Sequence, residues 1–204
     1  ALLRDAGREV VGATLRMLPC VNPGDRRSCC GPDGIAQAQA VAGRLGIAHY
    51  VFDCREVFEA QVLRPCWDEY AAGRTPNPCL RCNRFIKFGF LREVARQLGA
   101  DQVATGHYAR IATTPVGQAR LCRGNDVNKD QSYFLATLTP DQLATAIFPL
   151  GNMTKAEVRR QARELGLANA DRADSQDVCF AAAEGGFAEF LRQHLHATAS
   201  RGVI

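Results

Sequence analysis

Residues 75–83 read Thr-Pro-Asn-Pro-Cys-Leu-Arg-Cys-Asn, so two prolines stand directly before two cysteines. Each proline fixes its own φ angle and favours extended geometry in the residue before it, so no helix is expected before Pro78. Apolar residues then recur with helical spacing as far as Gly99, where a glycine can end a helix. A helix is therefore predicted to begin between Cys79 and Cys82, which lie on its first turn.

The two thiols of this turn are candidate reactive groups. Unpaired amide N–H groups and the positive end of the helix dipole favour a thiolate on the first turn. The same C-x-x-C spacing also fits half of a structural zinc site, a disulfide-exchange pair or two small buried residues. The sequence contains no second C-x-x-C pair, and prolines precede this one. We therefore favour a chemical role for Cys79 and Cys82.

Composition limits the class of protein. The chain has 204 residues, of which 47% are hydrophobic and 23% charged, which suits one globular domain and part of another. A formal charge of +4 permits a nucleic-acid partner without requiring one. Nine cysteines, no apolar signal segment and no bilayer-length apolar run indicate a reducing cytoplasm and no membrane partner, rather than a disulfide scaffold.

Helical and extended patterns alternate along the first half of the chain. Apolar runs at residues 9–15 and 47–53 predict buried strands, and residues 35–45 carry the apolar stripe of a helix between them. Residues 55–72 are predicted to be helical, with a break at Pro65. This alternation indicates an α/β fold with a doubly wound, mostly parallel sheet.

The second half adds candidate binding segments. A strand at residues 101–105 ends in Gly106-His107-Tyr108-Ala109-Arg110, and open α/β sheets bind ligands beyond the carboxyl ends of strands. Residues 115–117 predict a hairpin turn. The polar segment 125–133 is either a solvated loop or a binding loop, in which Lys129 can meet a phosphate and Gln131 a base or sugar. Capped helices are expected after Thr139 and Thr154, and an amphipathic helix at 185–194.

Six of the other cysteines divide into three groups. Cys54 and Cys66 are expected to pack in the core, and a buried structural role is the default for Cys179, which stands between two apolar residues. The loop that contains Cys20, Cys29 and Cys30 has no histidine, so a metal role and no metal role stay equally open.

The chain resembles a known family, the tRNA-specific 2-thiouridylases, which put sulfur on the wobble uridine (position 34) of certain tRNAs. The resemblance is carried by motifs in the family's order that span nearly the whole chain: Gly73–Pro78, Cys82-Asn83, Ile86-Lys87-Phe88, Ala104–Arg110, Asn128–Leu135, Phe148–Gly151, Asp174-Ser175-Gln176 and Cys179-Phe180.

This resemblance implies a fold and a reaction. The fold is of the adenine-nucleotide α-hydrolase type, with a nucleotide-binding and thiolation domain at residues 1–175 and the start of a smaller central tRNA-binding domain at 176–204. The enzyme uses ATP with Mg²⁺ to adenylate the uracil C2 oxygen, and a persulfide sulfur then displaces AMP. The implied partners are tRNA and a persulfide sulfur donor, either a cysteine desulfurase or a sulfur-relay protein.

Residue roles follow by position in the family's motifs. Cys179 matches the persulfide carrier, and Cys82 the nucleophile that attacks it or forms a disulfide with it to release the sulfur. The other matches are ATP contacts at Leu15 and Gly106, target-base contacts at Asn77, Pro78 and Cys79, and tRNA contacts at Lys129, Asp130 and Gln131.

Three departures from the family keep alternatives open. The family's Ser-Gly-Gly-x-Asp-Ser pyrophosphate loop and its C-terminal β-barrel are not in this sequence, so we expect a fragment at both ends that binds ATP poorly. Cys79 stands where many members carry aspartate, and with Cys82 and Cys179 it gives three thiolates for a [4Fe-4S] cluster, an alternative sulfur-transfer route. A non-catalytic relative that binds tRNA or a sulfur donor, and a metal-binding structural module, are the other readings.

Overall fold

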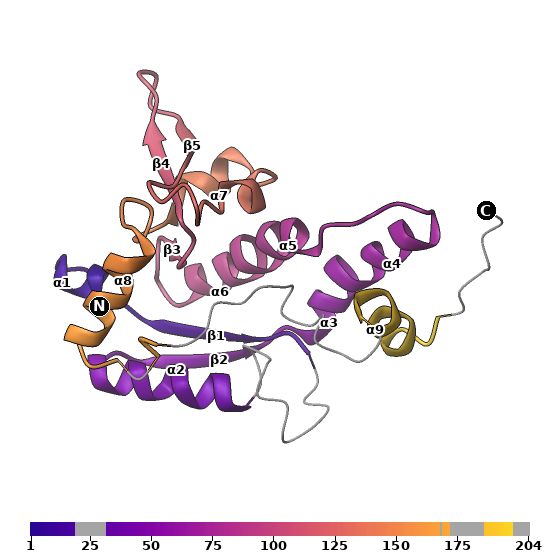
Figure 1. Ribbon diagram of the computed structural model, residues 1–204, viewed down its shortest axis with the longest axis horizontal. Helices are drawn as coiled ribbons and strands as arrows, with labels where there is room; N and C mark the ends of the chain where they lie inside the picture. The colour runs from indigo at the N-terminus through magenta and orange to yellow at the C-terminus, as the bar shows by residue number, and fades with distance from the viewer. Residues whose placement is uncertain (19–31, 168, 172–185, 198–204) are drawn as a thin grey trace.

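A computed structural model describes residues 1–18, 32–167, 169–171 and 186–197 (Figure 1). The elements in chain order are α1 (Leu2–Asp5), β1 (Gly12–Arg16), α2 (Pro32–Leu45), β2 (His49–Asp53), α3 (Arg55–Phe58), η1 (Glu59–Leu63), α4 (Arg64–Ala71), α5 (Pro78–Arg81), η2 (Cys82–Phe90), α6 (Leu91–Gln97), β3 (Val103–Ala104), β4 (Ala109–Thr113), β5 (Ala119–Arg123), η3 (Ser132–Leu135), α7 (Pro140–Ala144), β6 (Ala146–Ile147), α8 (Lys155–Glu164) and α9 (Gly186–His194). Here η1 and η2 are π-helical and η3 is a 3₁₀ turn.

The first parallel pair joins β1 and β2, whose partners run from Gly12 opposite His49 to Arg16 opposite Asp53. Helix α2 lies along this pair (Figure 1). The ladder continues one step further, because the Cys54 amide donates to the Arg16 carbonyl over 3.0 Å. The carboxyl ends of both strands therefore meet at Cys54.

The second parallel pair is short and joins β3 to β6. It is extended by amide bonds from Val103 to the Thr145 carbonyl at 2.9 Å and from Thr105 to the Ile147 carbonyl at 3.1 Å. The Arg8 guanidinium donates to the Gln102 side-chain oxygen over 2.6 Å. The segment before β1 therefore lies beside the segment before β3. The α/β class with parallel strands is confirmed, and the parallel strands of the described residues form two pairs.

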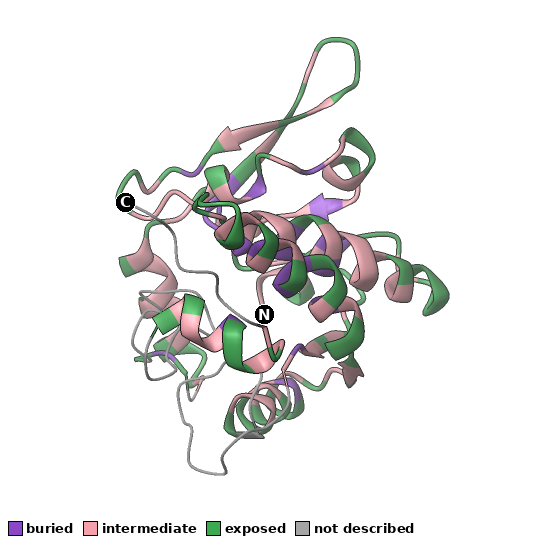
Figure 2. Ribbon diagram, turned by 90° about the vertical axis from the view of Figure 1, so that its right-hand side faces the viewer, coloured by how far each residue is buried: buried purple, intermediate pink, exposed green. Residues whose placement is uncertain are grey.

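A β-hairpin of β4 and β5 projects from this body (Figure 1), and its tip is exposed (Figure 2). Gly117 has a φ of +80° at the turn, so the predicted turn at 115–117 is confirmed. At its base the chain after β6 packs directly on β4. A Cβ atom at Gly151 would overlap the Ala109 carbonyl, so only glycine allows this approach.

Two apolar clusters form the core, and one long helix contributes to both. Ile86 belongs to the first cluster, with Met17, Cys54, Phe58, Val62, Leu63, Cys66, Cys82 and Leu191. Phe88 belongs to the second, with Val103, Ala109, Leu135, Leu138 and Ala146. Cys54 and Cys66 are 2% and 0% exposed, which confirms the prediction that they pack. The continuous helix α5–η2–α6 therefore fixes the two strand pairs relative to each other.

This helix begins at Pro78, one residue before the predicted range, because Asn77 caps it. The Asn77 side-chain oxygen accepts from the Cys79 and Leu80 amides at 3.1 and 3.4 Å. The helix ends before Gly99, which has a φ of +77° as predicted. The capping boxes at Thr139 and Thr154 are also present.

The predicted break at Pro65 is wrong, because α3, η1 and α4 run on as one helix through a π-helical turn. Proline has no amide hydrogen, so the carbonyl four residues earlier, that of Gln61, loses its helical donor. The Arg81 guanidinium donates to that carbonyl over 2.7 Å. The proline thus creates the acceptor that anchors the turn bearing Cys79 and Cys82.

This anchor predicts a coupling between Pro65 and Arg81. Arg81→Met keeps the apolar stem but removes the donor, and we expect it to lower the free energy of unfolding by about 1 kcal/mol. In a Pro65→Ala background the backbone supplies a donor, so the same change should cost roughly half as much. A double-mutant cycle by urea denaturation measures this coupling.

Arg84→Met is the matched control for that cycle. Arg81 and Arg84 both lie over the Phe85 ring, at 5.1 and 5.2 Å, so both variants lose this contact. The Arg84 change should be insensitive to Pro65→Ala. Strict additivity of Pro65→Ala and Arg81→Met would contradict the anchor.

Candidate functional site

Cys82 lies at the carboxyl ends of the first strand pair. Its sulfur contacts the Met17 sulfur at 3.9 Å, and Met17 directly follows β1. Cys54, directly after β2, donates its thiol to the Arg16 carbonyl at 3.3 Å. Cys82 is only 8% exposed, so the predicted reactive thiol is sheltered at the sheet edge where open α/β folds bind ligands.

The described cysteines differ in their surroundings. Cys79 is half-buried, and its amide is bound by the cap residue Asn77. Burial raises the pKa of the fully buried Cys66 to about 11, which keeps that sulfur protonated and unreactive. Among the described residues, Cys54, Cys66, Cys79, Cys82 and Cys122 form no disulfide with one another. The disulfide expected between Cys82 and Cys179 is untested, because Cys179 lies outside the described residues.

The thiol turn is joined to the segment that the family resemblance assigns to tRNA contacts. The Asn83 amide nitrogen donates to the Phe134 carbonyl over 2.9 Å, and Asn83 is 2% exposed. The Thr137 hydroxyl donates to the Leu80 carbonyl over 3.3 Å. Two sequence motifs about fifty residues apart are therefore adjacent in the structure.

Asp130 and Gln131 shape that segment from within. The Asp130 carboxylate accepts from the Gly124 amide at 2.9 Å and from the Ser132 amide and hydroxyl at 3.2 and 2.9 Å. Burial opposes the charge, but these bonds outweigh it and lower the pKa of Asp130. Gln131 exchanges bonds with Tyr108, accepting from its amide at 3.1 Å and donating its own amide to the Tyr108 carbonyl at 2.9 Å. The neighbouring Lys129 amide closes a turn onto the Asp126 carbonyl at 3.0 Å.

The two predicted ATP contacts lie on different strand pairs. Leu15 pairs with Phe52 in β2, and its side chain packs against the first core cluster. Gly106 follows β3 and is exposed, and a Cβ atom there would come no closer than 3.7 Å to Leu150. Neither position is tested as an ATP contact by the described structure, and a phosphate loop of the family's type is not in the sequence.

His107, beside Gly106, is a buried neutral residue. Burial lowers its pKa to about 3, and the Lys87 charge acts in the same direction. The Thr105 hydroxyl lies 2.7 Å from the imidazole Nδ1, and Phe148 packs edge-on against the ring. The imidazole is therefore a hydrogen-bonding group and carries no charge near neutral pH.

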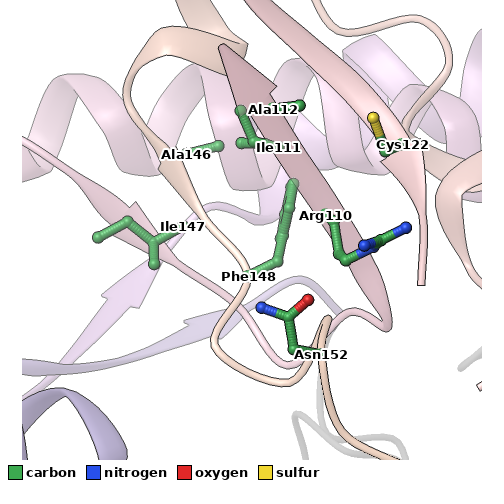
Figure 3. Close-up of a pocket in the computed structure, with 8 residues that line it drawn as sticks. All are labelled: Arg110, Ile111, Ala112, Cys122, Ala146, Ile147, Phe148 and Asn152. Atoms are coloured by element: carbon green, nitrogen blue, oxygen red, sulfur yellow. The ribbon is translucent and has the colours of Figure 1, made fainter. Parts of the chain in front are cut away.

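Two described cavities are not lined by the predicted site residues. One of about 540 Å³ lies between the hairpin and β6, with Phe148 between Ile147 and Arg110 (Figure 3). Another of about 380 Å³ lies between α2 and the first strand pair, where the Thr14 hydroxyl is 2.9 Å from His49 Nε2.

Several predictions concern residues outside the described ranges. Cys20, Cys29, Cys30 and Cys179 fall in undescribed segments. Within the described ranges no group of three metal-ligating side chains occurs, so a cluster that includes Cys179 is untested. Within the same ranges no helix is long and apolar enough to cross a membrane.

Sequence reasoning missed three site residues, Met17, Asn83 and Phe134. Met17 is apolar and carries no signal of its own. Asn83 follows the second cysteine directly, and a polar residue on the buried face of the predicted helix was the signal that could have identified it. Phe134 takes part through its carbonyl, which no sequence pattern reveals.

The chain is similar in sequence to known proteins over most of its length. The family model described as tRNA methyl transferase HUP domain matches residues 1–183. A protein of Heliobacterium modesticaldum named tRNA-specific 2-thiouridylase MnmA is 49% identical over 88% of this chain and 47% of its own length. Proteins of the same name from Thermus thermophilus and Syntrophotalea carbinolica are each 48% identical, over 95% and 100% of this chain and 53% and 56% of theirs. The chain thus spans about half the length of these relatives.

The shifted pKa of His107 predicts a pH dependence of stability. Below its ordinary pKa of 6.5 an unfolded histidine takes up a proton, whereas the folded one does not until about pH 3. Its contribution to stability is therefore complete above about pH 6.5 and is lost as the pH falls toward 3. Relative to His107→Gln, the wild type should lose on the order of 2 kcal/mol between about pH 7.5 and pH 5.

Urea denaturation of both proteins at the two pH values measures this difference. An NMR titration of the His107 ring in the folded protein checks the cause independently. A ring that takes up its proton near pH 6.5 would refute the assignment.

Proposed function

The chain belongs to the family described as tRNA methyl transferase HUP domain, and from this premise we propose that it is the thiolation part of a tRNA 2-thiouridylase. The proposed activity is ATP-dependent replacement of the C2 oxygen of uridine 34 by sulfur. The observation that carries the proposal is the position of Cys82, sheltered at the carboxyl ends of β1 and β2 and joined through Asn83 to the segment at residues 129–135. The names of the similar proteins support the same activity.

In this proposal Cys82 and Cys179 carry the sulfur chemistry. Cys179 holds the transferable sulfur as a persulfide. The Cys82 thiolate attacks the inner sulfur, so a Cys82–Cys179 disulfide forms, the S–S bond of the persulfide breaks and hydrosulfide leaves with the electron pair. The hydrosulfide replaces the C2 oxygen of the uracil. A thiol reductant restores the two cysteines.

The start of the thiol helix suits this role. Cys82 is the fifth residue of the helix that Asn77 caps, so its sulfur is held on a regular helix close to the helix start. Its low exposure limits access by water and by other thiols. Asn77, Pro78 and Cys79, on the same turn, are the proposed contacts of the target base.

ATP supplies the adenylyl group that lets the C2 oxygen leave as part of AMP. Leu15 and Gly106 are the proposed contacts of its adenine, and Mg²⁺ accompanies the phosphates. Lys129, Asp130 and Gln131 are the proposed tRNA contacts. The internal bonds of Asp130 and Gln131 support a role for these two in holding the segment's shape, which leaves Lys129 as the proposed direct contact with phosphate.

The cluster route is the second candidate. Its support is the second thiol of the turn, since Cys79, Cys82 and Cys179 offer three thiolates to a [4Fe-4S] cluster. A persulfide donor protein belongs to the first route and stays a prediction. The cytoplasmic location is a separate prediction that does not depend on the route.

The cysteines test the function in the full-length protein. Cys82→Ser and Cys179→Ser should each abolish 2-thiouridine formation, measured by mass spectrometry of digested tRNA, because a hydroxyl neither attacks nor carries a persulfide. Cys122→Ser is the control, a half-buried thiol in β5 away from the turn, and should keep wild-type activity. Full thiolation by the Cys82→Ser protein would remove the proposed nucleophile.

Cys79→Asp separates the two routes. Thiolation that persists in this variant, with no iron or sulfide in the anaerobically purified protein, supports the persulfide route. Loss of thiolation together with loss of bound iron and sulfide would establish the cluster instead.

A further inference from the structure

A tyrosine beside the thiol turn presents an aromatic face to solvent. Tyr133 is 57% exposed, and its ring lies against Phe134 with centroids 3.9 Å apart and planes inclined by 38°. A single exposed aromatic residue is ordinary on a protein surface. The anchoring and the position of this tyrosine set it apart.

The aromatic pair is anchored to the helix that carries Cys82. The Phe134 carbonyl is held by the buried Asn83 amide at 2.9 Å, and Asn83 is the residue after Cys82. On the other side Asp130 fixes Ser132 through its amide and hydroxyl. The backbone of Tyr133 is thus held between two buried or half-buried polar contacts, and its ring has a defined place relative to the thiol.

The turn that contains Tyr133 also lies next to the helix that carries Cys79, one of the proposed contacts of the target base. Helix α5, with Cys79, packs against the turn η3 that contains Tyr133. Burial of the phenol raises the pKa of Tyr133, and the nearby Cys79 thiol and Asp130 carboxylate raise it further. The phenol therefore stays uncharged at neutral pH and does not repel a polyanion.

The helix that carries Cys79 also carries two cationic side chains. The guanidinium groups of Arg81 and Arg84, two and five residues after Cys79, lie over the Phe85 ring at 5.1 and 5.2 Å. Exposed aromatic rings and cationic side chains together bind unstacked bases and their phosphates in single-stranded RNA.

We propose that Tyr133, supported by Phe134, is a stacking platform for a base that flanks the target uridine in the anticodon loop. This inference rests on the proposed function. Cys82 is sheltered and Tyr133 is exposed, so the target base turns inward to the thiol while its neighbour stays outside on the ring. Stacking one neighbour holds the loop open at the target position, which makes Tyr133 a positioning residue.

The test uses the full-length protein and an anticodon stem–loop with 2-aminopurine at either side of the target uridine. Wild-type binding should quench the fluorescence of one of the two probes. Tyr133→Ala should remove that quenching and raise the Kd about tenfold, since every base offers a π-face to an aromatic ring. Tyr133→Phe should keep both, because the ring is retained.

Two further variants keep the result interpretable. Tyr133→Leu preserves apolar bulk without a π-face and should behave like Tyr133→Ala, which excludes loss of folding as the cause. Tyr50→Ala removes another exposed tyrosine, 46% accessible on β2, and should change neither quenching nor Kd.

Thiolation of the natural tRNA by the wild type is measured in parallel. If the wild type thiolates but Tyr133→Ala binds and quenches normally, the platform is wrong and the proposed function stands. If the wild type forms no 2-thiouridine, the proposed function itself fails, whatever the fluorescence shows. For Tyr133→Ala, a lower kcat/KM together with an unchanged kcat at saturating tRNA supports positioning. A lower kcat at saturating tRNA contradicts it.

Discussion

The start of the thiol helix is the constraint on which the rest of the site depends. Two prolines exclude helical geometry before Pro78, and the Asn77 side chain satisfies the amides of Cys79 and Leu80. Cys79 is thereby fixed on the first turn of the helix, and Cys82, the fifth helical residue, lies at the start of the second turn. The same helix then runs through both apolar clusters, so the position of the thiols relative to the strands is set by the core.

Long-range polar contacts turn this local geometry into a site. A carbonyl freed by Pro65 holds Arg81, and Asn83 holds the carbonyl of Phe134. The first contact ties the turn to the preceding helix, and the second ties it to the segment proposed for tRNA. The first links residues that are 20 positions apart in the sequence, and the second links residues that are 51 positions apart. The thiol turn therefore gathers functions that the sequence spreads over separate motifs.

Local signals explain what could be predicted. The cap, the stops at glycine and the two capping boxes depend on neighbouring residues, and the hairpin turn around Gly117 does as well. The unbroken helix past Pro65 could not be predicted, because it requires a π-helical turn and the distant Arg81. For the site, the family motifs indicated the residues, whereas the contact of Cys82 with Met17 and the buried role of Asn83 depend on tertiary packing.

The central claim is that Cys82 displaces the transferable sulfur from Cys179 by forming a disulfide with it at one shared site. Peptide mapping of the full-length protein under non-reducing conditions, after a single turnover with persulfide donor, ATP and tRNA, tests it most directly. The account predicts one new cross-link, a Cys82–Cys179 disulfide, in an amount that matches the 2-thiouridine formed. Thiolated tRNA with both cysteines recovered as free thiols and no such cross-link would contradict it.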